Sequence, residues 1–363
     1  MVETLRGARS WLAVLVVSLA MIGCEVHFGP LEGAPSQGGG GVTPQATASA
    51  DGVVTGELWV YSSIYQSVID DLTALIAARY PGLKVQWYRA GSEVVARRLE
   101  AELRAGGTQA DLVMTSDPFW YDKLKSEGLL MPYVTPAVLP IDRNLMDLDG
   151  AWVTCRLSTM IIAYHPESIA EADLPATFEA LAEPRFAGKV TLGDPLSSGT
   201  NFTALAFLAE RYGWGWFETL RMQGAVASGG NSAVLRRVEG KEFALGVVLL
   251  ENVLAAQAGG SPVRYIMPSD GAISIPGPVA ILSSTDNPAA ARAVYDLMMS
   301  PEGQRLMVTG NMHSPNPSIP PPTGGPTLDA VLSSPFAWSA EFRGRVEGDT
   351  PAIKSRYDEI FNR

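Results

Sequence analysis

Short apolar runs of strand length alternate with amphipathic helical repeats between residues 58 and 125, and this alternation limits the possible folds more than any other feature of the chain. Leu58-Trp-Val-Tyr61 and Ala110-Asp-Leu-Val-Met114 are typical of buried strands. The expected elements are strands at 58–61, 83–87 and 110–114 and helices at 65–76, 92–103 and 119–125. Strand, helix, strand, helix, strand at this spacing predicts a parallel sheet flanked by helices.

Small polar residues follow each of these three strands. Ser62 and Ser63 come directly after the first, Ser92 follows the second, and Ser116 and Asp117 follow the third. Because ligands of parallel sheets bind beyond the carboxyl ends of the strands, we expect these positions to border a ligand. The alternative is local, since Ser63 has the spacing of a capping box, Ser92 is placed to cap the next helix, and loops after strands are generally polar.

The stretch from Thr191 to Thr203 has the features of an anion seat. Its first residues form a short strand that is cut off by Asp194-Pro195, and Ser198-Gly199-Thr200 then opens an amphipathic helix. The first N–H groups of a helix have no partner within it and lie at the positive end of its dipole. Hydroxyls around such an end suit phosphate, phosphonate or carboxylate groups. The alternative is that these residues only cap the helix.

A second α/β unit is expected after the Pro-rich loop at 132–150. The run from Ala151 to Tyr164 is almost continuously β-prone and long enough to cross between two lobes. Ser228-Gly-Gly-Asn-Ser232 opens a further helix. The other expected elements are a helix at 177–181, strands at 190–192, 243–249 and 263–267, a strand at 277–282 that rejoins the first sheet, helices at 288–299 and from 301, and short surface helices within 328–361.

The N-terminal segment predicts export and anchoring. Two arginines precede the apolar run at 11–22, which is too short to span a bilayer comfortably and is typical of a signal peptide. Met21-Ile-Gly-Cys24 resembles a bacterial lipobox, in which the cysteine is lipidated and becomes the new N-terminus; an ordinary secretory signal is the alternative. The Gly-, Pro- and Ser-rich segment that follows predicts a flexible tether between a lipid-anchored cysteine and the folded part.

Charge and cysteine content exclude several classes of protein. A formal net charge of -11 argues against a nucleic-acid partner and requires any anion site to be built locally. With 363 residues, 47% hydrophobic and 18% charged, the chain is a folded protein long enough for two domains. If Cys24 carries lipid, Cys155 has no partner for an intramolecular disulfide, and it is then expected as a small buried apolar residue.

Taken together, these segments make the chain resemble the extracellular solute-binding proteins of ABC importers, in the branch that includes ferric-ion, 2-aminoethylphosphonate and sugar-phosphate binders. The segments that carry the resemblance are Val60-Tyr-Ser-Ser63, Tyr80-Pro-Gly-Leu-Lys-Val85, Gly91-Ser-Glu-Val-Val-Ala-Arg-Arg-Leu-Glu-Ala-Glu102, Ala110-Asp111, Gly193-Asp-Pro195, Ser198-Gly-Thr200, Asn287-Pro-Ala-Ala-Ala291 and Ser300-Pro-Glu-Gly-Gln304. They span the chain from Gly56 to Gly310 in the order that is found in the family.

The resemblance implies two α/β lobes, each a mainly parallel sheet flanked by helices, that are joined by a hinge and close over a ligand. The implied organisation is a signal peptide at 1–23, a lipidated cysteine and tether at 24–55, lobe 1 at 56–150 and 270–363, and lobe 2 at 151–269. The implied ligand-binding residues are Ser62, Ser63, Ser116, Asp117, Ser197, Ser198, Gly199 and Thr200, together with Asn231 and Ser232 at another helix start. The implied partner is an ABC permease in the inner membrane.

One departure from the family bears on the ligand. Iron-binding members carry two adjacent tyrosines after the strand that is here Phe243–Leu249, whereas this sequence continues Leu250-Glu251-Asn252. Glu251 can coordinate a metal or hold an ammonium group, and Asn252 can hydrogen-bond a ligand. A small organic anion, either a phosphonate or a phosphate ester, fits the hydroxyl-rich helix ends better than ferric ion does. A ferric-ion or other metal-complex binder without the tyrosine pair is the alternative.

Two rival classes have to be compared with this prediction: an enzyme, which fits the sequence less well, and a sensor or adhesin subunit, which the sequence does not distinguish from a transport protein. An enzyme that uses Ser198 as a nucleophile needs a base nearby, and none of the three histidines of the chain is near Ser198 in sequence. No Gly-x-Ser-x-Gly elbow surrounds Ser198 either. A sensor or adhesin subunit would share the anchor and the cleft. We therefore predict a non-enzymatic, monomeric binding protein outside the cytoplasm, held at a membrane through Cys24, without a cofactor or a resident metal.

Overall fold

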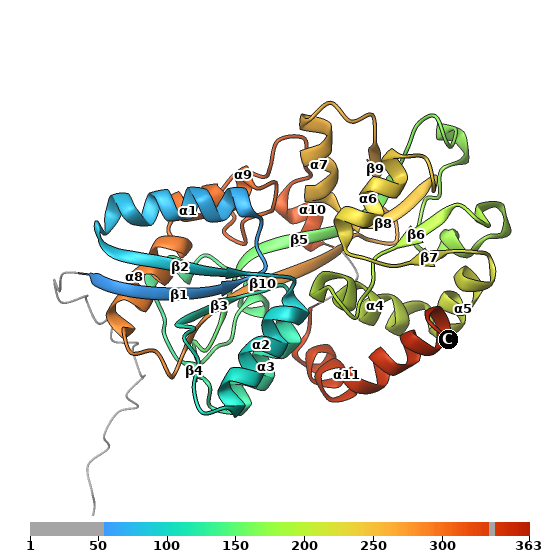
Figure 1. Ribbon diagram of the computed structural model, residues 1–363. Coiled ribbons are helices and arrows are strands. Elements are labelled where there is room, and N and C mark those ends of the chain that lie inside the picture. The colour runs from blue at the N-terminus through green and yellow to red at the C-terminus, as the bar shows by residue number, and fades with distance from the viewer. Residues whose placement is uncertain (1–53, 334–337) are drawn as a thin grey trace, which may run out of the picture. The chain divides into compact units, whose positions relative to one another are not determined.

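The computed structural model describes residues 54–333 and 338–363 (Figure 1). The expected signal peptide, the lipidation site Cys24 and nearly all of the tether lie outside the described residues. Within the described part of the chain, no helix is both long and apolar enough to cross a membrane.

The first strands and helices alternate as the sequence predicts. They are β1 (Thr55–Ser62), α1 (Gln66–Arg79), β2 (Gly82–Arg89), α2 (Ser92–Arg104), β3 (Leu112–Met114), α3 (Pro118–Ser126) and β4 (Leu130–Met131). Strand β1 lies between β2 and β3 and pairs in parallel with both. Successive side chains of β1 face opposite layers: Val60 clusters with Val68 of α1, whereas Tyr61 clusters with Val95 of α2. We call these elements, together with α8 and α9 described below, the β1 half.

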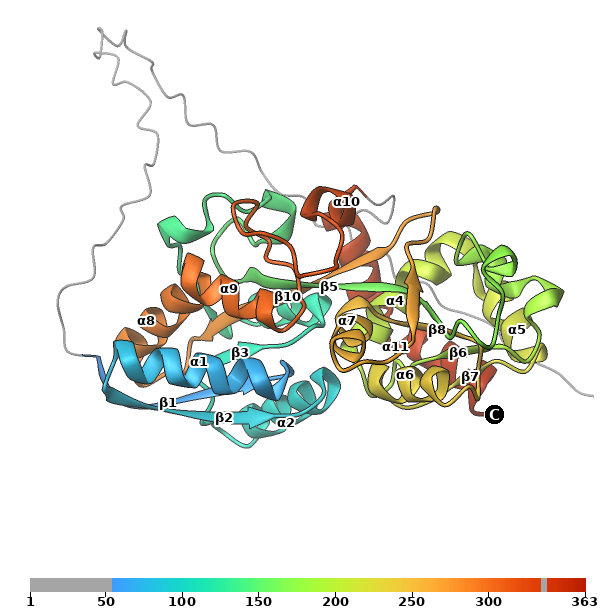
Figure 2. The same cartoon turned by 90° about the horizontal axis from the view of Figure 1, so that it is seen from above.

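Two long antiparallel strands connect this group to the next. Strand β5 (Val153–Tyr164) pairs with β10 (Ile273–Leu282), β10 continues to β3, and β5 continues to β8 (Figures 1 and 2). Among the described residues this makes one ten-stranded sheet whose main path is β2-β1-β3-β10-β5-β8-β6-β7. Every residue of β10 is buried, which explains its continuous apolar pattern. The expected crossing strand and the strand that rejoins the first sheet are both confirmed.

A second parallel group follows on the far side of β5. It contains β6 (Val190–Leu192), β7 (Val226–Ala227), β8 (Leu245–Leu249) and β9 (Arg264–Ile266), with α4 (Gly199–Tyr212), α5 (Trp214–Met222), α6 (Asn231–Glu239) and α7 (Leu250–Ala258). Strand β6 pairs in parallel with β7 and β8. We call this group the β6 half. Short 3-10 turns lie at Pro136–Val138, Arg143–Leu145, Glu171–Asp173, Glu179–Ala182 and Pro184–Phe186, so the helix expected at 177–181 is a 3-10 turn.

The chain ends in four helices, of which the last differs from expectation. They are α8 (Pro288–Met299), α9 (Pro301–Thr309), α10 (Leu328–Leu332) and α11 (Ala340–Phe361). The tail was expected as short helices, yet α11 is a single helix of 22 residues that contains Pro351. Its buried residues Phe342, Val346, Tyr357 and Phe361 recur at helical spacing on both sides of the proline. Packing along this stripe offsets the hydrogen bond that the proline removes.

Replacement of Phe342 by Ala tests how firmly α11 is packed. The Phe342 ring is 5% exposed and stacks on Phe207 with centroids 4.1 Å apart, so its loss leaves a cavity in a dense aromatic cluster. We expect the free energy of unfolding in urea to fall by about 3–5 kcal/mol. The control is Met222→Ala at a site that is 80% exposed, where a change within about 0.5 kcal/mol is expected. Equal effects of the two substitutions would contradict the packing of α11.

Candidate functional site

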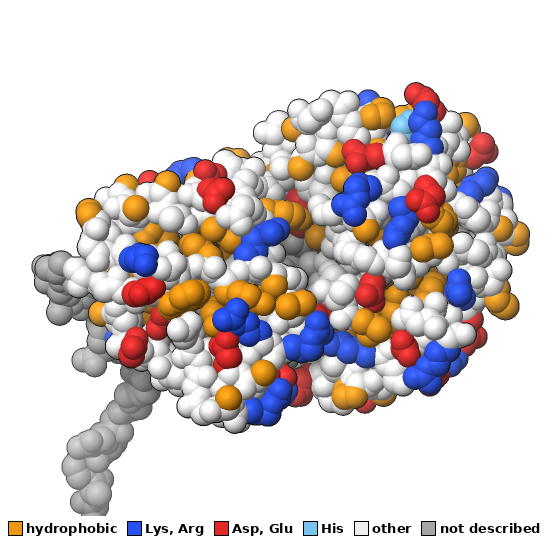
Figure 3. Space-filling view, viewed as in Figure 1, with side chains coloured by type: hydrophobic (Ala, Val, Ile, Leu, Met, Phe, Trp, Pro, Cys, Tyr) orange, Lys and Arg blue, Asp and Glu red, His pale blue; other side chains and the backbone are white. Residues whose placement is uncertain are grey.

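A cavity of about 410 Å³ lies between the β1 half and the β6 half. The surface is hollowed there, and most of the hollow is neither hydrophobic nor charged (Figure 3). The polar residues that line it are Ser63, Tyr65, Ser92 and Ser116 from the β1 half, Arg156 and Ser158 from β5, and Ser197, Ser198, Thr200, Asn231, Ser232, Arg236 and Asn252 from the β6 half. Segments far apart in sequence therefore form one site.

The strand ends of the β1 half meet in a small hydroxyl cluster. The Ser92 hydroxyl donates to Ser63 Oγ at 3.1 Å, and the backbone N–H of Ser116 donates to Ser92 Oγ at 3.1 Å. This arrangement shows that neither serine caps a helix, so the capping alternative is wrong for both. The N-cap of α1 is Tyr65 and that of α2 is Gly91, and neither helix start has a side-chain cap. The parallel strands bring the two hydroxyls together, so they bind one another and the next strand end instead.

Arg156 is the cation of the site. It is 1% exposed and is one of the largest fully buried side chains among the described residues. Its Nη2 donates to Ser116 Oγ at 2.8 Å and to Ser63 Oγ at 3.4 Å. Its Nη1 is also buried and has no hydrogen-bond partner in the described part of the chain. Burial lowers the pKa of the guanidinium, because a desolvated cation is less stable than a solvated one.

Sequence reasoning did not assign Arg156 to the site. The sequence does not decide whether Arg156, Arg97 and Arg264 enter the cleft or lie at the surface, so none of the three is among the expected site residues. In the structure Arg97 is an exposed partner of Glu93 at 4.0 Å, and Arg264 is exposed. The signal that could have identified Arg156 is its position in a long apolar β-prone run. A single arginine in a strand that is covered on both faces has no route to water.

Gly277 of β10 makes room for the guanidinium. A Cβ at this position would lie 2.9 Å from both Cγ and Cζ of Arg156, which is closer than real Cβ contacts. The register of β5 and β10 also shifts between Gly277 and Pro278. The neighbouring strand is therefore shaped to hold the arginine side chain flat against its backbone.

Two helix N-termini of the β6 half face the cavity. Ser198 is the N-cap of α4, and its hydroxyl accepts from Asn201 N at 3.4 Å and lies 3.0 Å from Thr200 Oγ1. Asn231, the first residue of α6, donates through Nδ2 to Thr200 Oγ1 at 2.9 Å. Ser198 therefore caps a helix and lines the cavity at once. Two positive helix ends and an arginine from β5 now point to one small space.

Four of the residues expected at the ligand do not line this cavity. Ser62 is fully buried, and its hydroxyl accepts from Ile64 N at 3.1 Å, so it shapes the turn after β1. A Cβ on Gly199 would lie 2.9 Å from the Ser116 carbonyl oxygen and 3.0 Å from Asp117 Cβ. Gly199 therefore lets α4 approach the β1 half closely. Asp117 borders a different cavity, beside α11.

Glu251 is the fourth of these residues. It is 2% exposed at the start of α7, where Oε2 accepts from Thr159 N at 3.4 Å. Its Oε1 is buried and has no hydrogen-bond partner among the described residues. Burial raises its pKa to about 7. The neighbouring Asn252 does line the cavity, and its Oδ1 accepts from the hydroxyl of Tyr65 at 3.2 Å, across the two halves.

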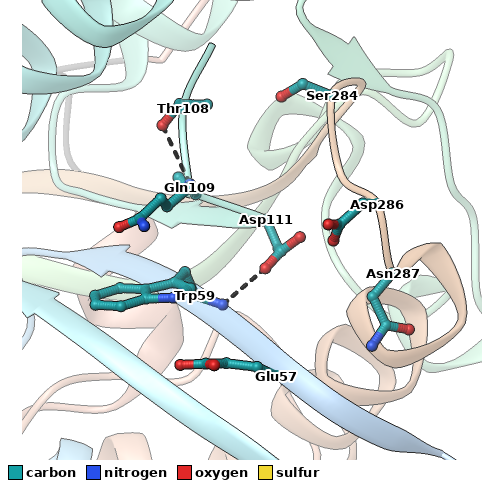
Figure 4. A pocket seen from close by; sticks show the side chains of 9 residues that line it. Glu57, Trp59, Thr108, Gln109, Asp111, Ser284, Asp286 and Asn287 are labelled. Atoms are coloured by element: carbon teal, nitrogen blue, oxygen red, sulfur yellow. Dashed lines mark hydrogen bonds between the residues drawn. The ribbon is translucent and has the colours of Figure 1, made fainter.

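A second cavity, of about 530 Å³, lies at the other ends of strands β1 and β3 (Figure 4). Its acidic residues are Glu57, Asp111 and Asp286. Both carboxylate oxygens of Asp111 are already bonded, to Trp59 N at 2.7 Å and to Thr285 Oγ1 at 2.6 Å. No cluster of three or more His, Cys, Asp or Glu that could hold a metal ion is found among the described residues. The first cavity is therefore the candidate binding site.

A family model described as "Bacterial extracellular solute-binding protein" matches residues 58–309. The chain belongs to this family. It is 26% identical over 293 residues to "Iron uptake protein A2" of Synechocystis sp., an alignment that covers 73% of this chain and 77% of that protein. These findings confirm the resemblance that the sequence motifs indicate.

Solved structures confirm the fold class. Iron-bound HitA from Pseudomonas aeruginosa superposes with a TM-score of 0.73 at 18% identity, over 83% of this chain and 99% of that one. AfuA from Actinobacillus pleuropneumoniae, with exogenous fructose-6-phosphate bound, gives a TM-score of 0.67 at 20% identity, over 82% and 98%. The solute-binding protein described here thus has the two-lobed α/β fold of periplasmic binding proteins. Its family and fold are those of transport proteins of ABC importers, which bind small molecules, and not those of enzymes.

The raised pKa of Glu251 predicts a pH dependence of stability. In the unfolded chain the carboxyl ionises near its ordinary pKa of about 4.3, whereas in the folded state it holds its proton up to about pH 7. The free energy of unfolding should therefore fall as pH rises from about 4.5 to about 7 and level off above that. We expect Glu251→Gln to remove this loss, with a gain over the wild type on the order of 2–3 kcal/mol at pH 8 and little gain at pH 4.5. Urea unfolding at the two pH values measures it, and a gain that is equal at both would contradict the assignment.

Proposed function

We propose that this solute-binding protein captures a small polar anion, a phosphonate or a phosphate ester, in the cavity between the two halves and delivers it to a membrane permease. The observation that carries the proposal is the buried guanidinium of Arg156, whose Nη1 has no partner among the described residues. A buried cation needs a nearby negative charge. Arg156 forms no ion pair with a carboxylate of the described residues, and no carboxylate lines the cavity; the buried Glu251 acts on Arg156 from beyond ion-pair distance and keeps its proton up to about pH 7. An anionic ligand provides the missing charge.

The geometry favours a group with several anionic oxygens. Guanidinium groups bind phosphate and carboxylate oxygens through paired N–H donors. Here Nη2 of Arg156 is bonded to serine hydroxyls, and Nη1 has no partner among the described residues. One ligand oxygen can therefore bind at Nη1 while other oxygens of the same group bind the hydroxyls of Ser63 and Ser116. Across the cavity, the first turns of α4 and α6 supply backbone N–H groups and the hydroxyls of Ser198 and Thr200. A tetrahedral phosphoryl group has oxygens to meet both sides.

The remaining space allows for an organic part on the ligand. A cavity of about 410 Å³ is much larger than an inorganic phosphate ion needs. Ser232 and the exposed Arg236 lie on its α6 side, and Asn252 lies on its α7 side. These side chains can hydrogen-bond hydroxyl or further anionic groups of an ester.

Ferric-ion binding, or binding of another metal complex, is the second candidate, since the names of two relatives refer to iron. Ferric ion is a hard cation that prefers negatively charged oxygen ligands. The cavity is lined by two arginines and one tyrosine, and Glu251 does not reach its wall. The hydroxyl of that tyrosine, Tyr65, is bonded to Asn252, and burial raises its pKa, which disfavours the phenolate that iron would bind. The cavity chemistry therefore supports the anion over bare iron.

We also propose that the two halves act as the lobes at 56–150 with 270–363 and at 151–269, hinged at β5 and β10. The close contacts at Gly199 and between Tyr65 and Asn252 would then belong to the closed arrangement.

The signal peptide and the lipid anchor on Cys24 remain predictions from the sequence. Growth with radiolabelled palmitate tests the anchor, because lipid on Cys24 labels the wild type and not Cys24→Ser.

A thermal-shift screen identifies the ligand class. The probes are inorganic phosphate, 2-aminoethylphosphonate, fructose 6-phosphate, ferric chloride and ferric citrate. A compound that binds only the folded state stabilises it by RT ln(1 + [L]/Kd), or about 2.7 kcal/mol at a hundredfold excess over Kd. We expect a rise in Tm with a phosphonate or phosphate ester. A rise with ferric ion alone would overturn the anion assignment and favour the second candidate.

Two variants locate the site once a probe binds. Each hydrogen bond to a charged group contributes about 1.5–3 kcal/mol, so Arg156→Met and the pair Ser198→Val with Thr200→Val should each weaken binding about tenfold to a hundredfold or more. Calorimetric titration measures the change in Kd, and far-UV circular dichroism checks the fold. Arg264→Met is the matched control, because Arg264 is exposed and does not line the cavity. Wild-type affinity in both site variants would place the ligand elsewhere.

A further inference from the structure

The C-terminal helix α11 touches both halves of the molecule and lies beyond the residues that the family model matches. Figure 1 shows it running from beside α3 in the β1 half to beneath α4 and α5 in the β6 half, and contacts with α3 and α5 agree with this view. The sequence predicted only surface helices here. A single long helix that spans both halves can influence how they are held together.

On the side of the β1 half, α11 is attached by two ion pairs. Arg343 Nε lies 2.9 Å from Asp122 Oδ2 of α3, and Lys354 Nζ lies 2.7 Å from Glu93 Oε2 of α2. Glu93 is only 7% exposed, so the second pair is largely shielded from water. Lys354 Nζ also lies 4.8 Å from the centre of the Phe202 ring, which belongs to α4 of the β6 half. Lys354 thus contacts both halves by itself.

On the side of the β6 half, α11 is attached by aromatic, hydrogen-bond and ionic contacts. The Phe342 ring stacks on Phe207 of α4, and the Tyr357 hydroxyl donates to the carbonyl of Ala227 at 3.1 Å. Arg345 pairs with Glu210 at 2.7 Å, and Arg356 pairs with Glu218. These exposed pairs contribute little singly, but they fix where α11 lies against α4 and α5.

The contacts of Lys354 lead directly to the candidate ligand site. Glu93 follows Ser92, which binds Ser63 and the backbone of Ser116 at the cavity wall. Phe202 lies in the first turn of α4, close after Thr200. Lys354 therefore contacts α2, which carries one wall of the cavity, and α4, which carries the other. Gly199 of α4 brings the same two walls together, since it lies close to Ser92 and Ser116.

Lys354 also neutralises a buried acidic pair. Asp117 and Glu93 line a cavity of about 550 Å³ beside α11, and each has a buried oxygen without a hydrogen-bond partner in the described residues. Burial and the neighbouring Glu93 carboxylate raise the pKa of Asp117 to about 7, while Lys354 acts in the opposite direction. Without the lysine, two carboxylates would face one another across the contact between α2, α3 and α4.

We propose that α11 is a strap that holds the two halves in the arrangement that forms the cavity, and that Lys354 is its positioning residue. In this arrangement the hydroxyls of the β1 half and the helix ends of the β6 half face one ligand. When the strap is weakened, the halves separate more often, and the site exists for a smaller fraction of the time. The apparent affinity for any ligand that needs both walls falls by that fraction. This role does not depend on which solute binds.

A distance measurement in the absence of ligand tests the strap separately from the proposed function. Spin labels are attached to Lys84→Cys on β2 and Met222→Cys on α5, both well exposed, in the full-length chain with Cys24→Ser. The native Cys155 is fully buried and burial raises its thiol pKa to about 11, so it resists labelling. Double electron–electron resonance then reports the separation of the two halves.

The variants compared are Lys354→Met, Lys354→Arg and Arg363→Met. Arg363 pairs only with Asp358 of the same helix among the described residues, so it is a charge-matched control. We expect one dominant distance in the wild type, Lys354→Arg and Arg363→Met. Lys354→Met should show a second, longer distance whose population is raised about tenfold, which corresponds to about 1.4 kcal/mol. If Lys354→Met does not fold by circular dichroism, Glu93→Gln takes its place with the same expectation.

Three outcomes would overturn the strap. One is a wild-type distribution already dominated by the long distance, and another is an unchanged distribution in Lys354→Met. The third is an equal change in Arg363→Met, because the effect would then follow from charge alone. None of these outcomes depends on Arg156 or on the ligand, so the strap and the anion site can fail independently.

Discussion

The burial of one positive charge is the constraint on which the rest of the site depends. Arg156 lies in the middle of the sheet, where water cannot solvate it, and its strand is covered on both faces. The surrounding structure meets this constraint in parts: hydroxyls from two strand ends accept from one nitrogen, and Gly277 leaves space for the side chain. What is left over is one buried donor, Nη1, that has no hydrogen-bond partner among the described residues. A binding protein can retain such a group because its ligand completes the hydrogen bonding.

The same cavity explains how an acidic chain could bind the anionic ligand that we propose. The formal net charge of -11 is spread over the molecule, whereas no carboxylate is among the residues that line the cavity. Within a low-dielectric site, a nearby guanidinium and two helix ends outweigh distant surface charges that water and salt screen. Glu251, a buried acidic residue that acts on Arg156, does not line the cavity and keeps its proton up to about pH 7. Local arrangement, not overall charge, thus sets the preference.

Closure of the site relies on small residues at the contact between the halves. Gly199 and Gly91 each lie too close to the opposite half to leave room for a side chain. A Cβ on Gly199 would lie 2.9 Å from the Ser116 carbonyl oxygen, and a Cβ on Gly91 would lie 3.0 Å from the Ser197 carbonyl oxygen. The sequence identified Gly199 as a ligand residue because it stands between two hydroxyls, but its neighbours are on the other half. Helix α11 then spans this contact from outside. In the closure that we propose, the cavity, the glycine contact and the strap are parts of one arrangement.

The sequence by itself determined the order of strands and helices, because that order follows from local periodicity. It also determined the polar strand ends and the hydroxyl-rich start of α4, because these depend on only a few neighbouring residues. Tertiary structure alone decided which polar groups meet. Ser63 and Ser92 had the spacing of caps, yet parallel pairing of β1 with its neighbours turns their hydroxyls toward each other. Arg156 became part of the site, and Asp117 and Glu251 were left out of its wall, because burial depends on how distant segments pack. The tail was expected as short helices, but a stripe of side chains that contact both halves keeps α11 whole across Pro351. Such long-range contacts have no counterpart in local sequence spacing.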